Sequence, residues 1–168
     1  FLGSIMASET TAAAGGAVGK LRFDPMAMLP FCGYNMADYF AHWLSIGEKT
    51  SAEKLPQIFF VNWFRRDNDG RFLWPGYGEN SRVLKWVFER ITGKGAAQKT
   101  AIGYLPDTNS LDVTGLTVSK DDLSALLTLD TAGWLEAVPQ IREHFANFGD
   151  RLPTKLKTSL DSLESALA

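Results

Sequence analysis

Apolar residues recur at helical spacing in four stretches of the chain. Residues 34–46 and 80–91 each carry one apolar stripe, and Gly93 ends the second. Two further stripes follow each other near the C-terminus, which predicts a pair of packed helices. The stripe residues are Tyr39, Phe40, Trp43 and Leu44; Val83, Leu84, Val87 and Ile91; Trp134, Val138, Ile141, Phe145 and Phe148; and Leu152, Leu156, Leu160, Leu163 and Leu167.

Strand and turn patterns complete the expected fold. The β-branched and aromatic run at 55–64 is typical of a buried strand, and Asp69-Gly70 predicts a sharp turn after it. Residues 1–6 also resemble a strand, entered partway and without an initiator methionine, so we interpret the chain as a segment of a longer protein. Ser119 and Asp122 form a capping-box pattern that opens a helix through residue 129. The expected fold class is α/β, a mixed sheet with flanking helices.

Composition narrows the class of protein. With 168 residues and 45% apolar content, the chain is long enough for one domain with its own core. A net charge of −2 does not indicate a nucleic acid or an anionic membrane as partner. Cys32 cannot form an internal disulfide, and His42 and His144 are too far apart to form a zinc site. No apolar run approaches the roughly 20 residues that span a bilayer, so we expect a cytoplasmic protein.

Aromatic residues gather between positions 59 and 77, which hold seven of the twenty in the chain. Phe64, Phe72 and Tyr77 fall where the predicted strand runs into a loop rich in glycine and proline, so their rings can face a cleft. An aromatic face there suits a flat heterocycle, because stacking one base on a ring contributes roughly 1–3 kcal/mol. The alternative is a small hydrophobic core under a long loop.

Small residues dominate positions 8–19, which include three glycines. This stretch has little apolar area to offset the entropy lost on ordering, so we expect it to be mobile. It is either a gating loop or a loose segment near the end of the chain. The string at 15–20 is not a Walker motif, because Ala14 stands at the first required glycine and Leu21 follows Lys20.

Three strings resemble a known enzyme family. DPMAMLPFCGYN at 24–35 and VNWFRRDNDGRFLWPGYGENSRVLKW at 61–86 are similar to the GTP-dependent phosphoenolpyruvate carboxykinases, and MASETTAAA at 6–14 resembles the active-site lid of that family. The resemblance is dense over residues 1–93. It implies that residues 1–168 are the C-terminal part of the GTP-binding domain, with the lid at 7–20, a guanine-binding strand, loop and helix at 55–93, and C-terminal helices at 119–168.

The resemblance also implies a guanine pocket. Asn80 would read the base edge, offering an acceptor to the N1 and N2 donors and a donor pair to O6. An amide can flip, so backbone groups of the preceding turn would share the discrimination. The alternative for Asn80 is a helix N-cap before Ser81. Tyr77 stands where animal members commonly carry phenylalanine. The implied pocket residues are Phe64, Phe72, Tyr77, Gly78, Glu79 and Asn80.

The implied lid includes Ser8 and Thr11 as catalytic residues, with Ala7 in place of an arginine of animal members. The family converts oxaloacetate and GTP to phosphoenolpyruvate, GDP and carbon dioxide with Mn²⁺ or Mg²⁺. The resemblance puts the metal ligands upstream of this segment, so we expect no metal ligand here and no activity from the segment alone. The expected partners are GTP, oxaloacetate or phosphoenolpyruvate, and the remainder of the polypeptide, with no nucleic acid and no membrane.

Two other functions were weighed on the same residues. One is a self-standing module that binds a nucleotide or single-stranded nucleic acid through Arg65, Arg66, Arg71 and the neighbouring aromatics. Against it, Asp67 and nearby acidic residues cancel the field of these arginines. The other is a structural or interaction protein whose aromatic cluster is purely packed.

Overall fold

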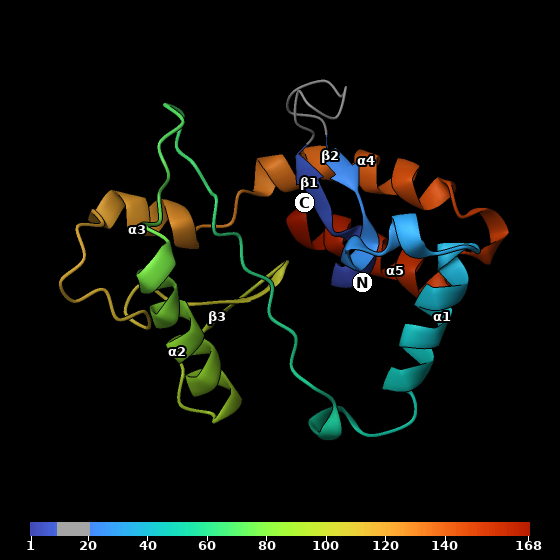
Figure 1. Ribbon diagram of the computed structural model, residues 1–168, viewed down its shortest axis with the longest axis horizontal. Helices are drawn as coiled ribbons and strands as arrows, with labels where there is room; N and C mark the ends of the chain where they lie inside the picture. The colour runs from blue at the N-terminus through green and yellow to red at the C-terminus, as the bar shows by residue number, and fades with distance from the viewer. Residues whose placement is uncertain (10–20) are drawn as a thin grey trace. The chain divides into compact units, whose positions relative to one another are not determined.

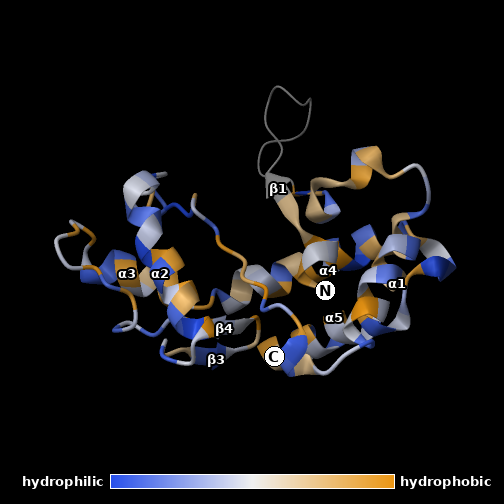
Figure 2. Cartoon of the chain, turned by 60° about the horizontal axis from the view of Figure 1, so that its bottom comes forward, coloured by the Kyte–Doolittle hydropathy of each residue, from blue (hydrophilic) through white to orange (hydrophobic). Residues whose placement is uncertain are grey.

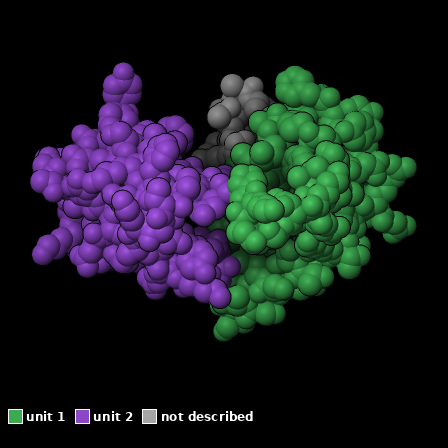
Figure 3. Space-filling model, turned by 90° about the horizontal axis from the view of Figure 1, so that it is seen from below, with its two compact units in different colours: residues 1–56, 131–168 green, residues 57–130 purple. Residues whose placement is uncertain are grey.

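The chain is described here by a computed structural model that covers residues 1–9 and 21–168, with only the backbone of Ser8 and Glu9. It divides into two compact units (Figure 3), unit 1 with residues 1–56 and 131–168 and unit 2 with residues 57–130. None of the described helices is long and apolar enough to cross a membrane. The predicted α/β class is confirmed, and the sheets found in the described residues are two antiparallel strand pairs.

Unit 1 combines three α-helices with one pair of short strands (Figure 1). Strands β1 and β2 are antiparallel, with Ala7 opposite Phe23 and Ser8 opposite Arg22. Short 3-10 turns link the longer elements. The α-helices and strands are β1 (Ala7–Glu9), β2 (Leu21–Phe23), α1 (Met36–Gly47), α4 (Thr131–Ala146) and α5 (Thr154–Leu167), and the 3-10 turns are Leu2–Ile5, Pro25–Ala27, Leu29–Phe31, Ala52–Lys54 and Gly149–Arg151.

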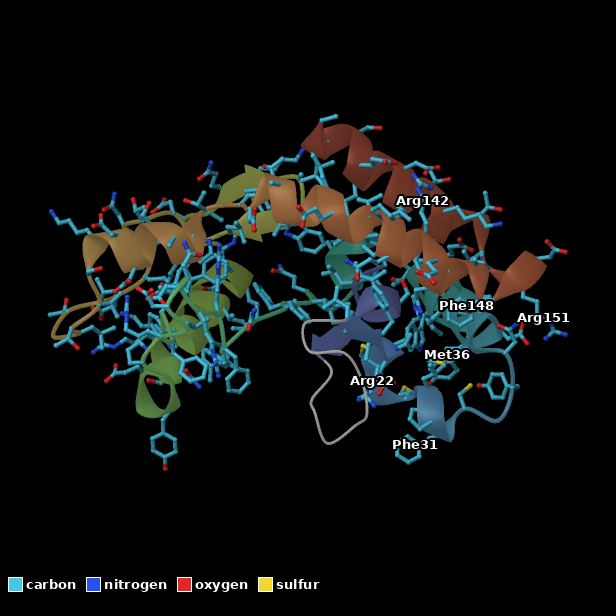
Figure 4. The ribbon with its side chains drawn as sticks, turned by 90° about the horizontal axis from the view of Figure 1, so that it is seen from above. Arg22, Phe31, Met36, Arg142, Phe148 and Arg151 are labelled. Carbon is cyan, nitrogen blue, oxygen red and sulfur yellow. The ribbon has the colours of Figure 1, made fainter. Side chains whose placement is uncertain are left out.

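The two C-terminal helices form the core of unit 1, as their spacing predicts. Helices α4 and α5 pack against each other, and Arg142 of α4 pairs with Asp161 of α5 at 2.9 Å and with Glu164. Figure 4 labels Arg142 on α4 and Phe148 just beyond its end. The residues buried along this pair are Val138, Ile141, His144, Phe145, Phe148, Leu152, Leu156, Leu160, Leu163 and Leu167. Trp134, the first residue of the predicted stripe, is half-buried.

Helix α1 is attached to this core at its first turn. The Asn35 side chain accepts from the backbone N–H of Ala37 at 2.9 Å, which caps the helix, and its amide NH₂ donates to the Phe148 carbonyl at 3.1 Å. Phe40 packs edge-on against Phe148 with ring centroids 5.1 Å apart. The apolar stripe predicted for 34–46 therefore lies on the packed face of α1. Of its four residues Phe40 is the fully buried one, and Met36, outside the predicted stripe, is buried as well.

The strand predicted over residues 1–6 is wrong. Residues Leu2–Ile5 form a 3-10 turn, closed by the Ser4 N–H and the Ser4 hydroxyl, which both donate to the Phe1 carbonyl at 3.0 and 2.6 Å. A serine that bonds to a nearby carbonyl in this way favours a turn over an extended ladder. The extended structure begins at Ala7, where β1 finds its partner β2.

Unit 2 holds the predicted helices at 80–91 and 119–129. Helix α2 spans Asn80–Ile91 as expected, and α3 spans Lys120–Leu127, two residues shorter at its end than predicted. The Ser119 side chain caps α3 by accepting from the Asp122 N–H at 3.0 Å. Strands β3 (Gln98–Thr100) and β4 (Gly103–Leu105) form an antiparallel hairpin between these helices in sequence.

The buried strand predicted at 55–64 is also wrong. This stretch has no regular secondary structure, and Ile58 and Phe60 are 78% and 59% exposed. A β-strand is held by hydrogen bonds to a neighbouring strand, and no described strand lies alongside this one. Phe59 instead packs edge-on against Trp86 of α2, with ring centroids 6.1 Å apart.

Helix α2 buries a different residue from those of its predicted stripe. Trp86 is buried, and its indole N–H donates to the Ala96 carbonyl at 2.9 Å. Leu84 and Ile91 of the stripe are 50% and 52% exposed, and Phe88 is 70% exposed. Figure 2 shows the resulting hydrophobic residues, in orange, along α2. This helix therefore carries an apolar surface that unit 2 does not cover by itself.

His144 is a buried histidine at the centre of unit 1. Its Nε2 lies 3.0 Å from the Ser4 carbonyl, and its ring stacks on Phe23 with centroids 4.6 Å apart. Nε2 must carry the proton in this contact, since a carbonyl only accepts. Burial lowers the pKa of His144 below its ordinary value of 6.5, and the hydrogen bond to Ser4 opposes that shift.

We predict that unit 1 loses stability as the pH falls through about 6.5. Because the pKa of His144 is lower in the folded state, the unfolded chain binds more protons in that range, which lowers the free energy of unfolding. Urea unfolding at pH 7.5 and 5.5 measures this difference. His144→Gln should make it smaller, because the amide can still donate to Ser4 but does not titrate. His42→Gln, at an exposed position of α1, is the control. If the difference in unfolding free energy between the two pH values is the same in the original protein and in both variants, His144 is not the group responsible.

Candidate functional site

The candidate site is built on a tight turn that joins residues 65 and 73. The Leu73 N–H donates to the Arg65 carbonyl at 3.0 Å, and the Asp67 N–H to the Arg71 carbonyl at 3.0 Å. The Asp67 carboxylate accepts from the backbone N–H groups of residues 69 and 71. Gly70 has φ +81°, a conformation that glycine adopts without strain. The turn predicted from Asp69-Gly70 is confirmed.

Two of the predicted ring residues lie on the two arms of this turn. Phe64 and Phe72 have ring centroids 6.3 Å apart and planes inclined by 61°. Both rings are exposed, at 71% and 46%. Because the rings are so inclined, a flat base in this arrangement can stack on the face of one while it meets the edge of the other.

Arg66 lies beside the same rings. Its guanidinium carbon is 4.3 Å from the centre of the Phe72 ring, a cation–π contact, and Arg66 and Phe72 form an isolated antiparallel bridge. One face of Phe72 is therefore covered by a cation, which holds the ring in place. Nothing in the sequence pattern distinguished Arg66 from its neighbours.

The third predicted ring, Tyr77, is held in an unusual conformation. Its φ is +45°, a left-handed value that is uncommon for residues other than glycine, and it follows Gly76 at +75°. The side chain is 98% exposed, so no packing compensates for this conformation. By contrast, Leu73 and Trp74 are both buried, with only 6% of each residue exposed. The loop thus buries two residues and presents the ring of Tyr77 outward.

Asn80 begins α2, and its side chain is turned toward the loop. The Trp74 indole N–H donates to the Asn80 amide oxygen at 3.0 Å. The N-cap position belongs to Glu79, whose side chain makes no capping bond. The alternative of Asn80 as a helix N-cap is therefore wrong, and its amide oxygen is held by a buried tryptophan instead.

Gly78 and Glu79 form the short 3-10 turn Tyr77–Glu79 ahead of α2. The Gly78 carbonyl accepts from the Ser81 hydroxyl at 2.8 Å, and the Glu79 N–H donates to the Gly76 carbonyl at 3.1 Å. The Glu79 carboxylate pairs with Arg82. The Gly78 carbonyl, the Glu79 N–H and the Glu79 carboxylate therefore already have partners in the turn and in the first residues of α2.

The remaining arginines of the loop are bound to protein groups. Arg71 makes a two-pronged contact with the Asp122 carboxylate at 2.7 and 3.3 Å, and this contact lowers the pKa of Asp122. Arg71 also pairs with Asp67 at 3.0 Å. Arg65 donates to the Leu126 carbonyl at 3.3 Å. These contacts attach the loop to α3, and the two carboxylates offset the charge of Arg71.

The predicted lid lies largely outside the described residues. Ser8 belongs to β1, where its backbone stands opposite Arg22, and its side chain is not described. Thr11 falls in the undescribed range 10–20. Among the residues with described side chains, no three His, Cys, Asp or Glu come together in a way that could hold a metal ion.

Comparison with known proteins identifies the class of this domain. The model of the phosphoenolpyruvate carboxykinase C-terminal P-loop domain matches residues 1–166, and the chain belongs to this family. It is 59% identical over 167 residues to the phosphoenolpyruvate carboxykinase [GTP] of Neocallimastix frontalis, and 53% and 50% identical to those of Treponema pallidum (strain Nichols) and Paenarthrobacter aurescens (strain TC1). Each match covers 99% of this chain, which spans 27 to 28% of the length of these relatives.

Trp74 belongs to the candidate site, although no sequence pattern indicated a role for it. Trp74 counted only as one of seven neighbouring aromatics, yet it holds the Asn80 amide. Its position six residues before the asparagine carries no periodicity that could have indicated this contact. The six predicted pocket residues do lie within one unit, on the two arms of the turn, in the 3-10 turn Tyr77–Glu79 and at the start of α2.

We predict that Tyr77→Gly leaves the stability of the protein within about 0.5 kcal/mol of the original. The exposed ring contributes no burial, and glycine adopts positive φ freely, which offsets its larger entropy loss on folding. Gly76→Ala is the matched control, since a Cβ there meets no atom within 4 Å but the positive φ is strained; it should cost about 1 kcal/mol. A loss of roughly 2–5 kcal/mol in Tyr77→Gly, typical of a truncated core residue, would mean that the ring is packed.

Proposed function

We propose that this chain is the guanine-recognition and lid segment of a GTP-dependent phosphoenolpyruvate carboxykinase. The reaction would convert oxaloacetate and GTP to phosphoenolpyruvate, GDP and carbon dioxide, and the enzyme would act in the cytoplasm. The proposal rests on the family match and on relatives that carry this name at 50 to 59% identity. Since the chain spans about a quarter of their length, the remaining machinery would come from elsewhere in the polypeptide.

The observation that best supports base binding is Tyr77. A protein that needed only stability could carry glycine at this position without loss, because the ring is 98% exposed and glycine adopts the positive φ of +45° freely. Strained residues persist where function requires them. In the proposed complex the purine would stack on the exposed rings of Phe64, Phe72 and Tyr77, at roughly 1–3 kcal/mol per ring contact.

Asn80 would give this surface its choice of base. Its amide lies at the start of α2, beside the turn that carries Tyr77. Guanine presents an oxygen at C6 and donors at N1 and N2, whereas adenine presents an amino group at C6. A side-chain amide held in one orientation can therefore favour the guanine edge over that of adenine.

The other parts of the segment would serve positioning and closure. Residues 7–20, with Ser8 and Thr11, would form the lid over the bound substrates. Mn²⁺ or Mg²⁺, held by ligands outside this segment, would stabilise the negative charge during phosphoryl transfer. The exposed apolar residues Leu84, Phe88 and Ile91 of α2 would pack against the remainder of the polypeptide.

Contacts of the loop arginines argue against the nucleic-acid alternative. A strand of nucleic acid requires free cations along its path, but Arg71 is paired with Asp122 and Asp67, and Arg65 is bound to the end of α3. Arg66 alone of the three lies over a ring of the site. The loop is therefore better suited to one uncharged base than to a chain of phosphates.

We predict that Asn80→Ala in the full-length enzyme narrows the preference for GTP over ATP by roughly 5- to 100-fold in kcat/KM, the equivalent of about 1–3 kcal/mol. The reason is that guanine loses a hydrogen bond that adenine does not make. Steady-state kinetics with both nucleotides measures the ratio.

Phe72→Ala is the control for this experiment. It removes a ring face, so it should weaken the binding of GTP and of ATP to the same extent, because stacking does not depend on the exocyclic groups of the base. The guanine assignment is refuted if Asn80→Ala leaves the ratio of GTP to ATP unchanged.

A further inference from the structure

The bond between Trp74 and Asn80 has a direction that matters for base choice. An indole N–H can only donate, so the atom 3.0 Å from Trp74 Nε1 must be the oxygen of the Asn80 amide. Trp74 is 6% exposed, so water cannot readily replace the oxygen as its partner. The side-chain amide is therefore held in one of its two orientations.

We infer that Trp74 is a specificity-determining positioning residue, which orients the Asn80 amide so that its NH₂ group faces the base. This inference rests on the proposed guanine site and adds what sets its selectivity. Turning the amide over would bring two donors together beside a buried indole. The loss of one hydrogen bond to a buried group makes the turned-over form roughly 5- to 100-fold rarer.

Asn35 is an example of a side-chain amide with a structural role at both of its ends. Asn35 uses both ends, its oxygen to cap α1 and its NH₂ to bind the Phe148 carbonyl. Asn80 uses its oxygen on Trp74, and among the described residues its NH₂ has no hydrogen-bond partner. The end of the amide that remains available is thus a donor.

A donor held in place selects for an acceptor on the ligand. The oxygen at C6 of guanine or hypoxanthine accepts such a hydrogen bond, whereas the amino group at C6 of adenine presents hydrogens to it. An asparagine free to turn over could serve either base. With Trp74 in place the site favours 6-oxopurines, and GTP and ITP should share this advantage over ATP.

The test uses Trp74→Phe in the full-length enzyme, with kcat/KM measured for GTP, ITP and ATP. Phenylalanine keeps an apolar ring in the buried position but cannot donate. The GTP-over-ATP ratio should narrow by roughly 3- to 10-fold, while the GTP-over-ITP ratio changes less than twofold. A Trp74→Phe ratio within twofold of the original enzyme would overturn the inference.

Trp86→Phe is the matched control. Trp86 lies in the same unit, is 5% exposed, and donates its indole N–H to the Ala96 carbonyl at 2.9 Å. The two variants should lower the thermal unfolding temperature to a similar extent, but Trp86→Phe should leave the nucleotide ratio within twofold. If Trp86→Phe narrows the ratio as much as Trp74→Phe, the effect is one of general stability and the inference fails.

A second variant, Asn80→Asp, tests the same idea without altering the buried ring. A carboxylate can still accept from Trp74, but its other oxygen now presents an acceptor to the base. It should lower the GTP-over-ATP ratio below that of Asn80→Ala, and an Asp variant that keeps the original ratio would refute an oriented donor. If Asn80→Ala leaves the GTP-over-ATP ratio unchanged, the proposed guanine site is wrong. If Asn80→Ala narrows that ratio and Trp74→Phe leaves it unchanged, the guanine site stands but Trp74 does not orient the Asn80 amide.

Discussion

The burial of Leu73 and Trp74 is the constraint on which the arrangement of the site depends. Both side chains are 6% exposed, although they lie in a loop between the exposed rings of Phe72 and Tyr77. Fixing two neighbouring residues inward fixes the backbone that carries the outward rings. The indole of Trp74 then reaches the first residue of α2 through the Asn80 amide. The rings proposed to stack on the base and the amide proposed to read it are thereby parts of one connected structure, and selective binding requires such preorganisation.

The opposite side of the loop is attached by charge rather than by burial. Arg71 grips the Asp122 carboxylate with two hydrogen bonds, and the backbone N–H of Asp122 is itself engaged by Ser119. An exposed ion pair of this kind adds little to stability, because water screens both charges. Its consequence is geometric, because it ties the turn to α3 and removes Arg71 from any role in attracting phosphates. These contacts of Arg71 do not favour the alternative of a nucleic-acid-binding module.

Features that depend on local chemistry were predictable from the sequence. The periodic stripes of α1, α2, α4 and α5, the cap at Ser119 and the turn at Gly70 each involve residues within a few positions of one another. The strand expected at 55–64 failed because a strand depends on a distant partner, and no described strand is paired with it. The apolar stripe predicted for α2 is not the buried face for a similar reason. The buried residue is Trp86, and its contacts with Phe59 and Ala96 are tertiary contacts that helical spacing does not predict.

The site divides in the same way. The ring residues could be located from their density in the sequence and from family resemblance, but the inclination of Phe64 to Phe72, the cation over Phe72 and the partner of the Asn80 oxygen are tertiary facts. No spacing rule connects a tryptophan to an asparagine six positions later across a loop. The lid remains a prediction, because residues 10–20 lie outside the part of the chain described here.

The central claim is that residues 62–82 form a base-binding surface, and hydrogen–deuterium exchange of the full-length enzyme with and without GTP tests it most directly. The account predicts that GTP slows exchange of backbone amides across the turn at 65–73 and the start of α2, while the hairpin of β3 and β4 at 98–105 is unaffected. ATP at the same concentration should give little of this protection. Equal exchange at residues 62–82 with and without GTP, under conditions where GTP is bound, would contradict the account.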